Sequence, residues 1–201
     1  MSEQKVFRAN ERKFWMRWRV RAGYPVAIAY WLLASPTIVS IVWGAVIAAI
    51  GLGIRAAASG HLRKDRELAM SGPYAWTRNP LYLGSAFLAG GFIVAGHSWI
   101  AGMLIAVYFG VFYYAVMRNE ERDLRVRFGA AYDEYSARVP SFVPRPAARR
   151  AEDVTRETDT TAAKFSWKQY RRNREYQALI GTILGLGTLV LRMWIHTRWG
   201  H

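Results

Sequence analysis

One short segment of the chain carries residues that could bind an anion. It reads SGPYAWTRNPLYLG over residues 71–84 and leads into a long apolar run. Asn79 is a favoured N-cap residue and Pro80 suits the first helical position, so a helix is predicted to begin here. Free backbone N–H groups and the dipole at a helix N-terminus attract a carboxylate or phosphate, and Arg78 adds positive charge. The segment predicts an anion site, although a capped membrane helix with aromatic anchors has the same pattern.

A second segment places two carboxylates directly after another apolar run. It reads RNEERDLRVRFG over residues 118–129, and its charges follow helical spacing. A mixed charge run of this kind is usually a solvated helix face. Glu120 and Glu121, however, stand where the chain leaves an apolar stretch, and carboxylates are costly there. The segment is therefore either a solvated helix face or a set of polar groups for a ligand.

Long apolar runs must position these two segments. A membrane-spanning helix needs about 20 mainly apolar residues, and somewhat shorter runs can span with aromatic or basic anchors beside them. Tyr24–Ala34 is apolar over only eleven residues, and we expect a short first span there rather than one arm of a re-entrant hairpin. The four longer runs are Pro36–Ile54, Leu81–Gly96, Trp99–Met117 and Ala178–Ile195. The sequence thus predicts an all-α protein, a polytopic transmembrane helix bundle with about five spans.

The distribution of positive charge predicts the orientation in the membrane. Seven Lys and Arg residues precede Tyr24, five lie in Arg55–Arg78 and fourteen in Arg118–Arg174. Cytoplasmic loops carry an excess of Lys and Arg, so these three regions are predicted to face the cytoplasm. The connection Gly96–Ser98 carries no formal charge, and we expect it on the opposite side. Both polar segments then lie at the cytoplasmic face.

The short uncharged connection also predicts that the spans on either side of it are antiparallel neighbours. Their cytoplasmic ends should therefore meet. The residues expected to come together are Arg78, Asn79, Tyr82, Arg118, Asn119, Glu120 and Glu121. A pocket with both signs of charge at the bilayer surface would suit a zwitterionic ligand.

The composition excludes several other classes of function. A formal net charge of +14 would indicate nucleic-acid binding in a soluble protein. Basic cytoplasmic loops beside anionic lipids explain the charge better, so we expect the membrane and no nucleic acid as partner. The absence of cysteine excludes disulfides and thiolate catalysis, and the histidines lack the spacing of metal ligands. The size and the Arg- and Ala-rich composition favour a bacterial inner membrane.

Composition also divides the chain into four parts. Residues 1–23 interleave aromatic with basic side chains and are predicted to lie along the membrane interface. Residues 24–145 hold four spans and both polar segments. Residues 146–164 mix Ala, Thr and both signs of charge without periodicity, which predicts a linker. Residues 165–201 form a second interfacial segment and the last span.

The two polar segments together resemble a known family of membrane enzymes. GPYAWTRNPLYLG (72–84) and NEERDLRVRFGAAYDEYSARVPSFVPR (119–145) are similar to motifs of the isoprenylcysteine carboxyl methyltransferase and phospholipid methyltransferase family. Its members carry Gly-Pro-Tyr, then Arg-His-Pro-x-Tyr-x-Gly, then a Glu-Glu helix and a Phe-Gly-x-x-Tyr-x-x-Tyr ending. The resemblance covers roughly Val39 to Pro146. It implies an S-adenosylmethionine-dependent methyltransferase whose cytoplasmic loops form the cofactor pocket.

The resemblance also implies roles for individual residues. Those implied to bind S-adenosylmethionine are Tyr74, Asn79, Pro80, Tyr82, Leu83, Gly84, Glu120 and Glu121. The chemistry of methyl transfer, and not the resemblance itself, adds a predicted catalytic set, which is Arg78, Arg118, Glu120 and Glu121. Asn79 departs from the family, which has histidine at this position. The asparagine keeps the capping role and a hydrogen-bond donor but lacks the acid–base chemistry of imidazole.

The chemistry of the acceptor decides what these residues must do. A carboxylate is already nucleophilic at neutral pH and needs a cation such as Arg78 or Arg118 to position it. An ammonium group must first lose a proton, for which Glu120 or Glu121 could serve as base. We expect a membrane-embedded or lipid-tailed acceptor. Two other functions stay open: a membrane reductase with a nicotinamide cofactor, against which the Glu-Glu segment argues, and a non-catalytic lipid-binding protein.

Overall fold

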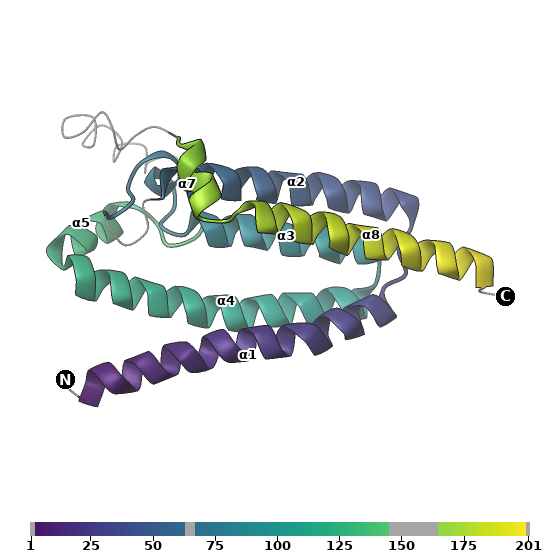
Figure 1. The fold of residues 1–201 in the computed structure, drawn as a ribbon, viewed down its shortest axis with the longest axis horizontal. Helices are drawn as coiled ribbons and strands as arrows, with labels where there is room; N and C mark the ends of the chain where they lie inside the picture. The colour runs from purple at the N-terminus through teal and green to yellow at the C-terminus, as the bar shows by residue number, and fades with distance from the viewer. Residues whose placement is uncertain (1–2, 63–66, 145–164, 200–201) are drawn as a thin grey trace. The chain divides into compact units, whose positions relative to one another are not determined.

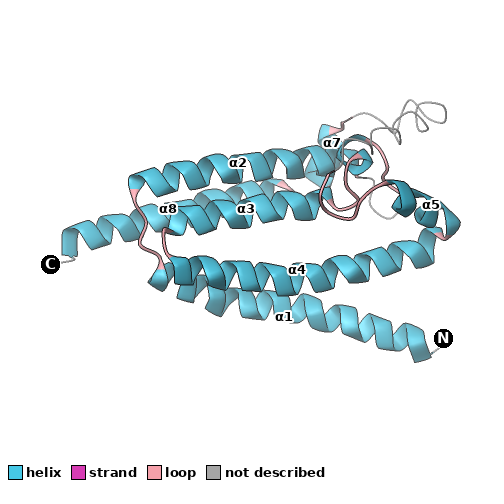
Figure 2. Ribbon diagram, turned by 180° about the vertical axis from the view of Figure 1, so that it is seen from behind, coloured by secondary structure: helices cyan, strands magenta, loops and turns pink. Residues whose placement is uncertain are grey.

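The structure is a computed structural model that describes residues 3–62, 67–144 and 165–199. Every regular element within these residues is a helix, as Figures 1 and 2 show. The elements are α1 (Glu3–Leu33), α2 (Ile38–His61), the 3₁₀-helix η1 (Gly72–Ala75), α3 (Pro80–Gly96), α4 (Trp99–Phe128), α5 (Ala130–Arg138), α7 (Trp167–Arg172) and α8 (Tyr176–Trp199). The predicted all-α class is confirmed. The predicted linker, residues 146–164, lies outside the described residues.

Among the residues that the structure describes, three helices are long and apolar enough to cross a membrane. These are α2, α4 and the part of α8 from Tyr176 to Arg198, and α3 is a shorter apolar helix. Only 11% of the most apolar stretch of α4 is buried inside the protein, so lipid must cover the rest of this surface. The four helices contain the four longer apolar runs of the sequence except for Pro36 and Thr37, which precede α2. The protein is therefore a polytopic membrane protein.

Helix α1 joins two parts of the chain that the sequence analysis separates. It runs over 31 residues without a break and includes Pro25. Residues 3–23 of the predicted interfacial segment and residues 24–33 of the predicted short span therefore share one helix. Helix α1 is not among the three that meet the length and hydropathy expected of a span. The domain boundaries drawn from composition stay predictions.

The described residues belong to two compact units. Unit 1 takes its residues from Met1–Val46, Ala89–Arg122 and Gly185–His201. Unit 2 takes its residues from Ile47–Leu88 and Asp123–Leu184. The helices α2, α3, α4 and α8 thus contribute residues to both, and each unit is described here by its own contacts.

Unit 1 is organised around two short turns. The turn between α1 and α2 meets the turn between α3 and α4, because the Ser35 N–H donates to the Gly96 carbonyl at 2.8 Å. Beside it, the Tyr30 hydroxyl donates to the Phe92 carbonyl at 2.6 Å. Helix α4 begins three residues after Gly96, which confirms the predicted short connection. The buried core of this unit consists of Tyr30, Ala34, Ala95, Ala101 and Leu189.

Within unit 1, an arginine attaches the second half of α8 to the end of α1. The guanidinium of Arg192 donates to the Ala34 and Leu32 carbonyls at the end of α1. It also lies 5.0 Å from the ring centre of Trp31, whose indole N–H donates to the Thr188 carbonyl. The Leu32 and Ala34 carbonyls lie at the C-terminal end of α1, where the last C=O groups of a helix have no partner within it. Arg192 therefore caps α1.

Unit 2 contains a close contact between α2 and α3. A Cβ built on Gly51 would lie 2.6 Å from the Gly84 carbonyl oxygen, and one built on Gly84 would lie 2.7 Å from that of Gly51. Small residues of this kind let the backbones of membrane helices approach closely. The contact fixes the first turns of α3, which follow the motif segment, against α2.

Candidate functional site

Helix α3 begins where the cap residues predict. The Asn79 carbonyl accepts the first helical hydrogen bonds, from the Tyr82 N–H at 3.1 Å and the Leu83 N–H at 3.0 Å. The hydroxyl oxygen of Thr77 accepts from the Asn79 N–H at 3.3 Å. Pro80 occupies the first helical position, where a missing N–H costs nothing. The prediction of a helix start at this motif is confirmed.

The residues after α5 hold this helix start in place. The Asn79 side-chain amide donates to the Ser141 carbonyl at 2.9 Å, and the Thr77 hydroxyl donates to the same carbonyl at 3.2 Å. The Arg78 N–H donates to the Pro140 carbonyl at 2.9 Å. Asn79 is only 6% exposed. Asn79 therefore ties α3 to the segment after α5.

Helix α5 supplies a small aromatic core beneath the same motif. Tyr132 and Tyr135 are buried and pack with Val139. The Tyr135 hydroxyl donates to the Tyr74 carbonyl at 2.7 Å, and Arg78 donates to the Tyr132 hydroxyl at 3.2 Å. Burial raises the pKa of Tyr135, Tyr132 adds to this rise and Arg78 opposes it. These tyrosines are packing residues, as their spacing on one helix face indicates.

The Tyr135→Phe variant tests this hydrogen bond. It leaves the buried Tyr74 carbonyl one donor short, which we expect to lower the free energy of unfolding by about 1–2 kcal/mol. Thermal unfolding in detergent measures the effect. The control is Tyr114→Phe, because Tyr114 is 60% exposed and its loss of a hydroxyl should change little. Equal unfolding temperatures for the two variants would contradict the assigned role of Tyr135.

The predicted cofactor residues in the first turns of α3 differ in their surroundings. Tyr82 and Leu83 are partly exposed, whereas Gly84 is buried. A Cβ on Gly84 would meet the Arg55 side chain and the Gly51 carbonyl. The glycine is thus required for packing against α2. Contacts of these residues with a cofactor stay a prediction.

The predicted acidic residues lie on α4, in unit 1. Glu120 is exposed and Glu121 is half-buried. Arg118 lies 5.7 Å from the ring centre of Tyr114, one turn earlier in the helix. Tyr74, Arg78, Asn79 and the residues up to Gly84 lie in unit 2. The expected meeting of the two motif segments stays a prediction.

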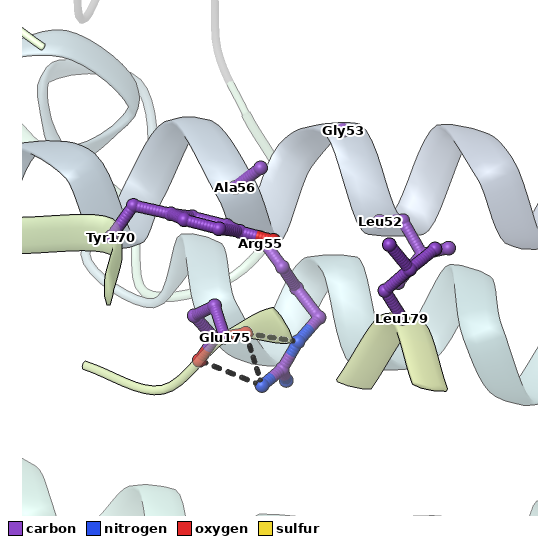
Figure 3. A pocket seen from close by; sticks show the side chains of 7 residues that line it. All are labelled: Leu52, Gly53, Arg55, Ala56, Tyr170, Glu175 and Leu179. Carbon is purple, nitrogen blue, oxygen red and sulfur yellow. Dashed lines mark hydrogen bonds and ion pairs between the residues drawn. The ribbon is translucent and has the colours of Figure 1, made fainter. Parts of the chain in front are cut away.

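Sequence analysis missed a partly buried ion pair in unit 2. The Arg55 guanidinium contacts the Glu175 carboxylate at 2.8 Å, with the two side chains 20% and 11% exposed. The pair lies at a pocket of about 230 Å³. Figure 3 shows the side chains that line this pocket. The residues that line the pocket are Leu52, Gly53, Arg55, Ala56, Tyr170, Glu175 and Leu179. A basic residue inside an apolar helix and an acidic residue within a basic stretch were the available signals.

Comparison with known proteins places these segments in a family. The profile of the phospholipid methyltransferase family matches residues 29–131, about half of the chain. This range includes the segment that begins α3 and both glutamates of α4. The chain belongs to the phospholipid methyltransferase family. No solved structure matches the chain significantly.

The relatives that the chain matches carry different names. The chain is 34% identical over 92 residues to a nickel-cobalt-cadmium resistance protein of Alcaligenes xylosoxydans xylosoxydans, covering 46% of this chain and 43% of that protein. It is 42% identical over 82 residues to methanethiol S-methyltransferase 2 of Bradyrhizobium diazoefficiens, covering 40% and 30%. It is 31% identical over 81 residues to protein-S-isoprenylcysteine O-methyltransferase of Schizosaccharomyces pombe, covering 40% and 34%. The chain thus spans less than half the length of each relative.

Proposed function

We propose that this protein transfers a methyl group from S-adenosylmethionine to an acceptor dissolved in the membrane, at the cytoplasmic face. Membership of the phospholipid methyltransferase family carries the proposal, because the matched residues include both polar segments. Two relatives are named for methyl transfer, one to methanethiol and one to isoprenylcysteine. The basic regions of the sequence support a cytoplasmic site in a bacterial inner membrane.

The donor set of the two segments fits a zwitterionic cofactor. The N-terminus of α3 and Arg78 can bind a carboxylate, as the methionine part of the cofactor requires. Glu120 and Glu121 can accept hydrogen bonds from an ammonium group and from ribose hydroxyls. When bound, S-adenosylmethionine supplies an electrophilic methyl group on a sulfonium. In this proposal Tyr74, Asn79, Pro80, Tyr82, Leu83 and Gly84 form the remainder of the cofactor site.

The residues of the chain then orient the reactants and exclude water. Methyl transfer is an in-line displacement, and correct placement of the reacting atoms supplies much of its rate. Arg78 or Arg118 would hold a carboxylate acceptor. Glu120 or Glu121 would take the proton from an ammonium or thiol acceptor. Asn79 contributes position and not proton transfer, because its amide does not titrate and is engaged with Ser141.

The proposed site at the membrane surface suggests the class of the acceptor. Methanethiol and isoprenylcysteine, the acceptors in the names of two relatives, share an apolar part that dissolves in a bilayer. We propose an acceptor of this type, with a thiol, carboxylate or amine as its reacting group. It would reach the site sideways from the membrane, whereas the water-soluble cofactor would come from the cytoplasm.

A methyl-transfer assay in vesicles tests the proposal. Purified protein is reconstituted with bacterial lipids, and S-adenosylmethionine with a labelled methyl group is added together with a thiol, a prenylated carboxylate or no further acceptor. We expect label in the organic extract or the volatile fraction with at least one acceptor. The Glu120→Gln, Glu121→Gln double variant should give none. If the folded protein binds no S-adenosylhomocysteine but binds a nicotinamide cofactor, the proposal is wrong and the reductase alternative gains support.

A further inference from the structure

Arg55 makes an unusual set of contacts for a residue in an apolar helix. On one side its guanidinium donates to both oxygens of Glu175, each at 3.0 Å, as the dashed lines of Figure 3 show. Ionisable side chains within membrane helices are costly unless they are paired. Glu175 immediately precedes α8, so the pair attaches the start of α8 to α2.

The other side of the same guanidinium reaches α3. Its Nη1 donates to the Ser85 hydroxyl at 2.5 Å and to the Leu81 carbonyl at 3.4 Å. The Ser85 hydroxyl in turn donates to the Leu81 carbonyl at 2.9 Å. Leu81 and Ser85 flank the predicted cofactor residues Tyr82, Leu83 and Gly84. Arg55 therefore connects Glu175 to the first turns of α3.

The segment that supplies Glu175 lies outside the family match, which ends at residue 131. It is nevertheless bound tightly to α2. The Asn173 side-chain amide donates to the Ser59 and Leu62 carbonyls at 2.8 and 3.1 Å, and the Ser166 N–H donates to the Gly60 carbonyl at 3.0 Å. These contacts satisfy carbonyl groups at the end of α2 that lack helical partners. Glu175 is thus held in a defined place.

We infer that Arg55 is a positioning residue for the methyltransferase site, held by Glu175 and acting on the first turns of α3. The inference rests on the proposed function. Each of the contacts of Arg55 fixes a different part of one planar, rigid guanidinium. Without Glu175, the long arginine side chain is free to extend toward water or lipid head groups. Its hydrogen bonds to Ser85 and Leu81 would then loosen, and with them the placement of Tyr82 and Leu83.

Three single variants of the full chain in detergent test the inference. Glu175→Gln removes the carboxylate that binds the Arg55 guanidinium. Ser85→Ala removes the contact of Arg55 with the Ser85 hydroxyl on α3 and leaves the ion pair. Arg55→Gln removes the ion pair and the contact with α3. We expect each to weaken S-adenosylhomocysteine binding by about tenfold or more, which corresponds to a loss of about 1.4 kcal/mol in binding free energy. Titration calorimetry measures the affinity at a temperature at which every variant is folded.

Two further variants separate positioning from general loosening. Arg192→Gln weakens the attachment of α8 through carbonyls of α1 and should lower the unfolding temperature while the affinity stays at the wild-type value. The exchanged pair Arg55→Glu, Glu175→Arg restores opposite charges but cannot donate to the Leu81 carbonyl. We expect it to recover the unfolding temperature lost in Glu175→Gln without recovering the affinity.

The outcomes distinguish a failure of this inference from a failure of the proposed function. Wild-type affinity in Glu175→Gln, Ser85→Ala and Arg55→Gln would overturn the inference alone. An equal loss of affinity in Arg192→Gln would also overturn it, because the effect would then follow stability. Absence of binding to the folded wild type would overturn the proposed function and this inference with it.

Discussion

Replacement of Glu120 and Glu121 by glutamine is expected to weaken S-adenosylhomocysteine binding by at least ~100-fold. This product of methyl transfer keeps the ammonium and ribose groups that the proposal assigns to the two carboxylates. A hydrogen bond to a charged group contributes about 1.5–3 kcal/mol, and every 1.4 kcal/mol is tenfold in affinity. Titration calorimetry on detergent-purified protein gives the two affinities.

The chain offers a matched control for this double variant. Asp133 and Glu134 are also adjacent acids on a helix, and their ion pairs with Arg125 and Arg138 are exposed to solvent. Exposed pairs contribute little to stability. The Asp133→Asn, Glu134→Gln double variant also removes two negative charges. It should bind S-adenosylhomocysteine with wild-type affinity. A similar loss in both double variants would mean that net charge, and not the Glu-Glu segment, determines binding.

The Gly51→Ala variant is expected to lower the free energy of unfolding by about 1–3 kcal/mol, the usual range for overpacked sites. The new Cβ would lie 2.6 Å from the Gly84 carbonyl oxygen and 2.9 Å from the Leu88 nitrogen. Both are backbone atoms that cannot turn aside, so α2 and α3 must separate locally. Unfolding by denaturing detergent, followed by circular dichroism, measures the change.

Gly53→Ala is the control, two residues along the same helix. A Cβ at Gly53 meets no atom within 4 Å. Since alanine favours a helix interior over glycine by about 0.8–1.0 kcal/mol, this variant should be at least as stable as the wild type. If Gly51→Ala and Gly53→Ala have the same stability, the prediction that α2 and α3 are in close contact at Gly51 is wrong.

Local chemistry made several features of the fold predictable from the sequence. Asn79 and Pro80 mark the start of α3 because both act within one helical turn. The absence of charge at Gly96–Ser98 indicates a tight connection between two apolar runs. Tyr132 and Tyr135, three residues apart, face the same side of a helix. In each case the determining residues are close neighbours in the chain.

The contacts of Arg55 could not be predicted in this way. By the charge rule it is only the first basic residue after an apolar run, at the edge of a cytoplasmic loop. In the structure it lies within α2 and binds Glu175, 120 positions away. A pair at that separation leaves no periodic pattern, because its two members lie in segments that are far apart in the sequence.

The continuity of α1 has a different cause. Basic and aromatic residues alternate before Tyr24, and the change of composition there suggests a boundary between two segments. Most of these residues are nevertheless compatible with a helix. A change from interfacial to apolar composition therefore does not end the helix, and α1 continues through Pro25 to Leu33.

The capping of α2 by Asn173 also concerns the order of events during protein synthesis. Asn173 follows Ser59, whose carbonyl it binds, by 114 positions. At about 5–20 residues per second, a ribosome needs on the order of ten seconds to add them. During that interval α2 and α3 can already be inserted in the membrane. The carbonyls at the end of α2 then still lack the hydrogen bonds from Asn173, which follows α7. Unit 2 can therefore reach its final form only late in translation, after most of the chain has been synthesised.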